Sequence, residues 1–450
     1  YEQAEKSYKS LGDWLHRDAS SVRDHDPDIF VQGSFRLGTV IRPISDDEEY
    51  DVDCACSLTS LSKSDLSQHD LKDMLGEEIK LYRDSKGIKK PVHEGRRCWR
   101  LEYADGAQFH MDIVPCIPNA EDQRLLLEAR SLDATYADTA IAITDNEVAA
   151  YDVITDDWPR SNPRGYAEWF KSRMGDVFLR RRQQILEEMR AEGVTASVED
   201  IPTYRVRTPL QSAIMILKRH RDTMFADDPT DKPISIIISS LAAHAYQGEE
   251  TIGYALLSIL NRMEEAIEHD GTKYVIKNPT DALENFADKW EEHPERASAF
   301  FEWLKQARED FSAASRLVEH RRMSTVLADR MGRHLTDQVS DAALQPTQPG
   351  SPGLVKAAGV ASAASAPSVS FADAPRTPKK PDGFACLGGC YWAAKRPPSL
   401  NSKAARIGYL SRTGRPTVIL KCASLLPSRM APNALFLGCG IRASFLMLRR

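Results

Sequence analysis

The sequence lacks several features that would place it outside the soluble globular proteins. Its 450 residues contain no apolar run of about 18 or more, so no membrane-spanning helix is predicted. The first residues are charged and polar, without the apolar stretch of a signal peptide. No internal repeat is present either. With 42% apolar and 28% charged residues, the chain is expected to form two or more globular domains in the cytoplasm.

The eight cysteines form no framework typical of a disulfide-rich protein. Four of them lie in apolar, strand-like segments, where a cysteine usually serves as a small buried residue in a reducing compartment. The other four lie near the C-terminus in irregular, Gly-rich surroundings, so a zinc site there is the weaker interpretation. The first group is Cys54, Cys56, Cys98 and Cys116, and the second is Cys386, Cys390, Cys422 and Cys439.

Charge is distributed unevenly along the chain. The last hundred residues contain fifteen Lys and Arg, two Asp and no Glu, a net charge of +13. Because the whole chain carries −6, the first 350 residues carry −19. An acidic body with a basic tail is not typical of a protein that binds extended nucleic acid over its main surface.

The patterning predicts an α/β (α+β) fold with a sheet domain followed by an all-helical domain. We expect a catalytic core over residues 1–160 and a helical lid over 161–344. A low-complexity linker and a disordered tail are expected over 345–450. Helices are predicted over residues 1–24, 69–83, 165–190, 208–224, 235–246, 251–268, 281–291 and 296–335, and strands over 28–33, 50–58, 98–104 and 107–117. The last two strands are predicted to form a hairpin that turns at Asp105-Gly106.

Two short motifs in the first domain suggest phosphate and metal chemistry. The Gly33-Ser34 turn follows a strand, and its small residues let backbone N–H groups approach a phosphate, although such pairs are also common in ordinary turns. Asp51 and Asp53 lie on one face of a strand whose other face is apolar. Neighbouring carboxylates repel each other unless protons or cations intervene. An ordinary solvated strand face is the alternative, and the apolar opposite face of the strand argues against it.

A third carboxylate strengthens the metal interpretation. Asp112 lies between Met111 and Ile113, which are expected to point into the core, and a carboxylate there needs a partner or a metal ion. If the two strands are neighbours, the three carboxylates converge. Hard oxygen ligands suit Mg²⁺ or Mn²⁺, and two ions about 4 Å apart suit transfer of a nucleotide to a hydroxyl. His110 shares a face with Asp112, where a packed or supporting histidine is expected rather than a ligand.

The order Gly-Ser, D-x-D strand and third Asp resembles the polymerase-β-like nucleotidyltransferases. More narrowly, four stretches resemble the bacterial cGAS/DncV-like nucleotidyltransferases (CD-NTases) of CBASS anti-phage systems. This resemblance covers residues 1–340 and excludes the tail. The stretches are VQGSFRLGTVIRPI with EYDVDCACSL, MDIVPCIP, SNPRGYAEWF, and TPLQSAIMILKRHRDTMF with KPISIIISSLAAHAY.

The resemblance implies a role for each matching residue. Gly33 and Ser34 would hold the donor triphosphate, and the three aspartates would bind two Mg²⁺ or Mn²⁺ ions and help activate a 2′- or 3′-hydroxyl. Lys218 lies on the helix that faces the triphosphate in this family. Ser235 starts the next helix, whose dipole favours phosphate, and the residue is itself a good N-cap. Arg36 and Thr39 are additional candidates for contact with phosphate or base.

Three functions follow from these residues. The first is a cyclic oligonucleotide synthase that takes ATP, with or without other NTPs, and signals to a separate CBASS effector, in some relatives under a HORMA-type activator. The second is a nucleotidyltransferase that modifies RNA, a protein or a small molecule, although the acidic body disfavours a large RNA. The third is a non-catalytic scaffold, disfavoured because unused clustered carboxylates would be an electrostatic burden.

Overall fold

A computed structural model describes residues 2–42, 50–103, 109–191, 206–316, 327–328 and 330–332. All of them belong to one compact unit that comprises residues 1–368. The predicted turn at Asp105-Gly106 and everything predicted after residue 345 lie outside the described residues. Among the described helices none is long and apolar enough to cross a membrane.

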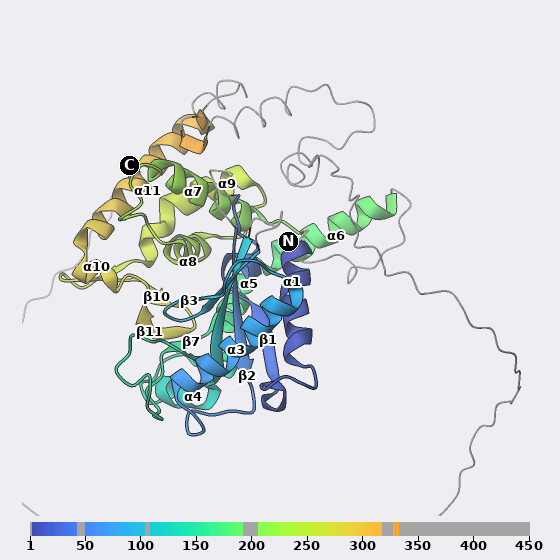
Figure 1. The fold of residues 1–450 in the computed structure, drawn as a ribbon. Coiled ribbons are helices and arrows are strands. Elements are labelled where there is room, and N and C mark those ends of the chain that lie inside the picture. The colour runs from blue at the N-terminus through green and yellow to red at the C-terminus, as the bar shows by residue number, and fades with distance from the viewer. Residues whose placement is uncertain are drawn as a thin grey trace, which may run out of the picture. The chain divides into compact units, whose positions relative to one another are not determined.

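The elements follow the predicted order, with strands concentrated in the first part of the chain and helices in the second (Figure 1). The strands are β1 (Pro27–Val31), β2 (Tyr50–Leu58), β3 (His93–Glu94), β4 (Trp99–Tyr103), β5 (Phe109–Pro118), β6 (Ile141–Ile143), β7 (Arg160–Ser161), β8 (Glu268–His269), β9 (Tyr274–Val275), β10 (Lys277–Asn278) and β11 (Asp281–Asn285). The helices are α1 (Glu2–Leu15), α2 (Gly33–Leu37), α3 (Gln68–Lys86), α4 (Ala120–Glu128), α5 (Pro163–Arg173), α6 (Gly175–Ala191), α7 (Pro209–Met224), α8 (Ser235–Ala245), α9 (Ile252–Arg262), α10 (Lys289–Glu292) and α11 (Pro294–Ser315), with short 3-10 turns at Arg23–His25, Ala137–Thr139 and Met263–Ala266.

The first seven described strands form one mixed sheet. Its order is β1-β2-β5-β4-β3, with β6 paired to the far end of β5 and β7 paired to β6. The β2–β5 pair is parallel, whereas β1 and β4 run antiparallel to their neighbours. In this central pair, two segments that are almost sixty residues apart in the sequence lie side by side. Because they are parallel, both strands begin at the same end of the sheet.

One face of this sheet packs against α1 and α3. The residues buried there come from alternate positions of the strands, as expected where only one face of each strand meets the helices. Figure 1 shows α1 and α3 over this face. The layer includes Leu11 and Leu15 from α1, Leu71, Leu75 and Ile79 from α3, Val52, Cys54 and Cys56 from β2, and Met111 and Ile113 from β5. The carboxylates predicted to bind metal are thus left on the opposite face.

The helices from α5 onward enclose a second apolar core. It is formed mainly by α7, α8, α9 and α11, together with the aromatic residues of α5. Trp169 and Phe170 are buried in it. This mixed α/β architecture confirms the predicted fold class, although the part expected to be all-helical also contains the short strands β8 to β11.

Several predicted helix bounds are wrong for local reasons. The helix expected over 281–291 is instead the strand β11, which pairs with β10, and the short helix α10. The helix expected over 165–190 is interrupted at Met174, where the backbone leaves the helical region before α6 begins. The first helix ends at Leu15 and not at residue 24. The antiparallel pairing of β4 with β5 and the bounds of β2 are as predicted.

Candidate functional site

Parallel pairing of β2 with β5 brings the predicted carboxylates together. In this register Asp53 lies beside Asp112, and Asp51 lies beside His110. All four side chains therefore project from the same face of two adjacent strands. The prediction that the two strands are neighbours is confirmed, and it accounts for the convergence of groups that are far apart in the sequence.

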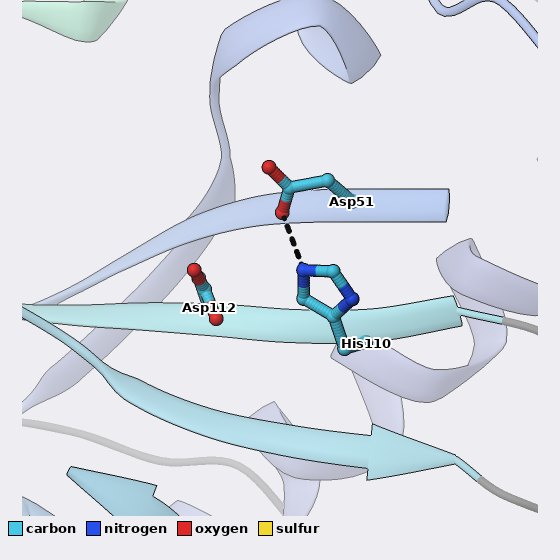
Figure 2. A group of neighbouring side chains, drawn as sticks. All are labelled: Asp51, His110 and Asp112. Carbon is cyan, nitrogen blue, oxygen red and sulfur yellow. Dashed lines mark ion pairs between the residues drawn. The ribbon is translucent and has the colours of Figure 1, made fainter. Parts of the chain in front are cut away.

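Three of these side chains lie close enough to share a ligand. A carboxylate oxygen of Asp51, a ring nitrogen of His110 and a carboxylate oxygen of Asp112 all lie within 4.8 Å of one another. Figure 2 shows the Asp51 carboxylate on β2 facing the His110 ring on β5, with Asp112 further along β5. The His110 Nε2 to Asp51 Oδ1 distance is 3.3 Å, and this hydrogen bond raises the pKa of the imidazole. His110 therefore contacts Asp51 directly, which is consistent with the supporting role expected for it.

The Asp53 carboxyl is turned toward the segment that follows β1. A Cβ atom at Gly33 would overlap the Asp53 carboxylate, and Gly33 has a φ of +57°. The absence of a side chain at Gly33 thus lets the backbone of this segment lie directly against the carboxylates. The Gln32 N–H also donates to the Asp53 carbonyl oxygen at 2.8 Å.

Burial of Asp53 makes its negative charge unfavourable. Desolvation, and secondly the charges of Asp51 and Asp112, raise the pKa of the Asp53 carboxyl to about 7. A carboxylate that is destabilised by neighbouring carboxylates is one that a bound cation would stabilise. The carboxylates of this site therefore suit a divalent cation, and Asp51 and Asp112 lie with His110 close enough together to share one.

Arg100 on β4 was not identified from the sequence. It lies opposite Asp112 in the β4–β5 register, and its Nε and Nη2 atoms each donate to one oxygen of that carboxylate at 2.8 Å. Such a two-pronged contact is the geometry that guanidinium groups favour. In the described structure, Arg100 thus supplies the positive charge nearest to Asp112.

The segment from Gly33 to Thr39 forms the neighbouring wall. The short helix α2 begins at Gly33 and ends at Leu37, and the N–H of its C-cap, Gly38, donates back to the carbonyls of Phe35 and Ser34. The Thr39 N–H also donates to the Ser34 carbonyl oxygen, at 2.9 Å. These hydrogen bonds hold the segment in a compact conformation that contains a short helix, whereas only a turn at Gly33-Ser34 was predicted. Burial lowers the pKa of the Arg36 guanidinium, the additional candidate on this helix.

Lys218 on α7 reaches this segment from the helical part. Its Nζ lies 3.3 Å from both the carbonyl and the hydroxyl oxygen of Thr39, which is fully buried. The Lys218 side chain is itself only 3% exposed, so it is not an ordinary surface lysine. Desolvation, and secondly the charge of Arg221, lower the pKa of the Lys218 ammonium to about 8.

Ser235 differs from its predicted local role. The N-cap of α8 is Ile234, which has an extended backbone, and Ser235 is already the first helical residue. Its hydroxyl oxygen instead accepts a hydrogen bond from Arg221 Nη1 at 3.0 Å. Ser235 therefore starts the helix as predicted, but it is not the cap.

The comparisons with known proteins agree with this geometry. Residues 27–115 match the sequence model of the family described as "Cyclic GMP-AMP synthase DncV-like, nucleotidyltransferase domain". The match includes Gly33, Ser34, Asp51, Asp53 and Asp112, which are the residues that line the described site.

Two curated relatives extend the similarity beyond that domain. A c-di-GMP synthase from Roseivirga ehrenbergii is 28% identical over 302 residues, 66% of this chain and 70% of the relative. The cyclic dinucleotide synthase CdnG from Bradyrhizobium diazoefficiens is 24% identical over 299 residues, 64% of this chain and 66% of the relative. Both alignments are long enough to include sheet and helical parts.

A solved structure supports the fold. The Bradyrhizobium diazoefficiens CD-NTase CdnG in complex with GTP superposes with a TM-score of 0.54 at 20% identity, and the match covers 76% of this chain and 92% of that one. The sheet carboxylates, the family match over residues 27–115 and the similarity to two named synthases together support a CD-NTase of the polymerase-β-like nucleotidyltransferase superfamily.

Proposed function

We propose that this chain is a cyclic oligonucleotide synthase of the CD-NTase family. In each transfer a hydroxyl oxygen of one nucleotide bonds to the α-phosphorus of an NTP, the bond to the β-phosphate breaks, and pyrophosphate leaves. A final intramolecular transfer of the same kind closes the ring. The observation that carries the proposal is the parallel β2–β5 register, which places three carboxylates beside the Gly33–Thr39 segment.

The chemistry is assigned to the three carboxylates. Asp51, Asp53 and Asp112 would hold one or two divalent cations, which neutralise charge on the leaving pyrophosphate and lower the pKa of an attached hydroxyl. Asp112 would also help to orient and deprotonate the acceptor. Gly33 and Ser34 would bind the donor triphosphate through the backbone, with Lys218 and the start of α8 at Ser235 providing further phosphate contacts. The sheet part, residues 1–160, would then be the catalytic core and residues 161–344 the lid.

The choice of base is a separate prediction. ATP was expected from the family resemblance, whereas the names of the relatives refer to c-di-GMP and to GTP. We therefore expect GTP to be used at least as well as ATP. A second messenger made in the cytoplasm for anti-phage defence, a HORMA-type activator and a separate effector are further predictions of the same proposal.

The test is incubation of the purified chain with Mg²⁺ or Mn²⁺ and labelled NTPs, singly and in pairs, followed by phosphatase. With the label on the α-phosphate, NTPs lose all of it and a linear product keeps only the label in its internal linkages, whereas a cyclic product has no terminal phosphate and keeps all of its label. Chromatography then separates the linear from the cyclic resistant material. Label recovered instead on RNA or protein would replace the proposal with transfer to that acceptor. The Asp51→Ala, Asp53→Ala double variant is the control and should give no resistant product.

Arg100 provides a prediction about metal binding. Replacing it with Met should lower the half-saturating Mn²⁺ concentration by roughly fivefold, because the guanidinium engages both Asp112 oxygens and competes with the cation. We use about 1 kcal/mol for this partly exposed pair. Mn²⁺ binding is measured by electron paramagnetic resonance without nucleotide. Lys90→Gln is the control. It removes a positive charge that pairs with Glu102, on the same strand as Arg100, and it should leave Mn²⁺ binding unchanged. Weaker Mn²⁺ binding by the Met variant would show that Arg100 instead holds the Asp112 carboxylate in place as a metal ligand.

A further inference from the structure

Three side chains, one just before α7 and two within it, donate hydrogen bonds to consecutive backbone carbonyls at the end of the Gly33–Thr39 segment. This segment, which contains the proposed triphosphate ligands, is called the phosphate segment below. Gln211 Nε2 donates to the Leu37 carbonyl at 2.9 Å. The Arg207 guanidinium donates to the Gly38 carbonyl, and Lys218 Nζ reaches the Thr39 carbonyl at 3.3 Å. The end of α2 is therefore attached to a helix that lies more than 170 residues later in the chain.

Gln211 is the member of this group that uses both ends of its side chain. Its Oε1 accepts from the Thr208 backbone N–H at 3.0 Å and from the Thr208 hydroxyl at 3.1 Å. This is the capping box that starts α7. At the same time, Nε2 donates to Leu37, and the side chain is 6% exposed. Only an amide provides this acceptor and this donor together; a carboxylate would keep the cap and lose the link.

The backbone of the phosphate segment is shaped to receive this amide. Gly38 has a φ of +67°, and a Cβ atom there would lie 2.5 Å from Gln211 Nε2. At the other end of the segment, Gly33 makes room for the Asp53 carboxylate in the same way. The segment is therefore in close contact with the catalytic strand at its beginning and with α7 at its end.

We propose that Gln211 is a positioning residue that holds the Gly33–Thr39 segment in place for the donor triphosphate. The inference rests on the proposed function, because it takes Gly33 and Ser34 as phosphate ligands. The link joins two groups of the protein itself, so losing the Nε2 donor should loosen the segment even without nucleotide. Nucleotide affinity should then fall because binding must also order the segment.

Two single substitutions separate the link from the cap. Gln211→Glu keeps an N3 acceptor for Thr208 but places an acceptor against the Leu37 carbonyl. Thr208→Ala removes the cap hydroxyl and keeps the amide donor. Gln211→Ala provides a second loss of the link if the buried carboxylate of the Glu variant prevents folding. The first readout is hydrogen exchange of the amides of residues 34–39 without nucleotide, and the second is the Kd for non-hydrolysable GTP and ATP analogues with Mg²⁺.

The expected result for the Gln211 variants is faster exchange in residues 34–39 and an analogue Kd about tenfold higher. Thr208→Ala should lower Tm and change the Kd by less than about twofold. Unchanged exchange in the Gln211 variants, or an equal loss of affinity in Thr208→Ala, would overturn the inference. If exchange accelerates but the unmodified protein binds neither analogue, Gln211 still positions the segment, and it is the proposed function that fails.

Discussion

Replacing Asp53 with Asn should reduce product formation by at least about a thousandfold and also make the metal-free protein more stable to heat. The loss of activity follows because cation binding at the reacting phosphate is worth several kcal/mol, and every 1.36 kcal/mol is tenfold in rate. The gain in stability follows because Asn has no charge to bury beside Asp51 and Asp112.

The gain in stability should depend on pH in one direction. The pKa of the Asp53 carboxyl is about 7 in the folded protein and near 3.8 when unfolded, so the folded state retains a proton that the unfolded state has lost. Stability therefore falls as pH rises from about 4 through 7, and the full penalty is present above 7. The Asn variant escapes it, so its advantage in Tm should be largest at pH 8 and small at pH 4.

The measurement is thermal unfolding in EDTA at both pH values, with product formation assayed separately. Asp122→Asn is the control, because Asp122 is largely exposed, pairs with Lys63 and lies away from the carboxylates. It should change neither activity nor the pH dependence of Tm. A Tm for Asp53→Asn below that of the unmodified protein at pH 8 would show that Asp53 is stabilised by its surroundings, which would contradict this description of the site.

Replacing Lys218 with Met should weaken NTP binding by on the order of tenfold to a hundredfold, the usual range for a lost charge-assisted contact. Burial lowers the pKa of the Lys218 ammonium to about 8, so part of the unliganded protein is neutral there at pH 8. A bound triphosphate favours the charged form. Binding at pH 8 should therefore take up protons, and the Met variant should lose that uptake.

Calorimetric titration in two buffers with different ionisation enthalpies measures both quantities. Lys232→Met is the matched control, because Lys232 is more exposed and pairs with Asp222. It should retain the affinity and the proton uptake of the unmodified protein. If the Lys218 variant takes up as many protons as the unmodified protein, the titrating group is another residue, and Lys218 does not contact the phosphates.

Patterns confined to one strand were enough to predict the centre of the fold. In β2 the alternation of apolar and carboxylate residues fixed both its bounds and its two faces. In β5, Asp112 between Met111 and Ile113 indicated a polar group on an otherwise buried strand, and both neighbours are fully buried. Thr208 followed by Pro209 predicted the start of α7, which Gln211 completes as a capping box.

Contacts that depend on the register of a strand pair, or on residues far apart in the sequence, could not be predicted from such local patterns. A two-residue turn at Asp105-Gly106 would pair Arg100 with Met111. The observed pairing of Tyr103 with Phe109 shifts the register by one residue and places Arg100 opposite Asp112. In the same way, nothing near Gln211 in the sequence indicates that its amide meets Leu37, because that contact joins two parts of the fold.

The most direct test of the account is mass spectrometry of the phosphatase-resistant material formed from GTP, ATP or both in the presence of Mg²⁺ or Mn²⁺. We predict an ion whose mass equals that of two or three nucleoside monophosphates less one water per linkage, including the linkage that closes the ring. It should be absent with Asp51→Asn. A product that retains a free end, or the same cyclic ion from the Asp51 variant, would contradict the assignment of ring synthesis to these carboxylates.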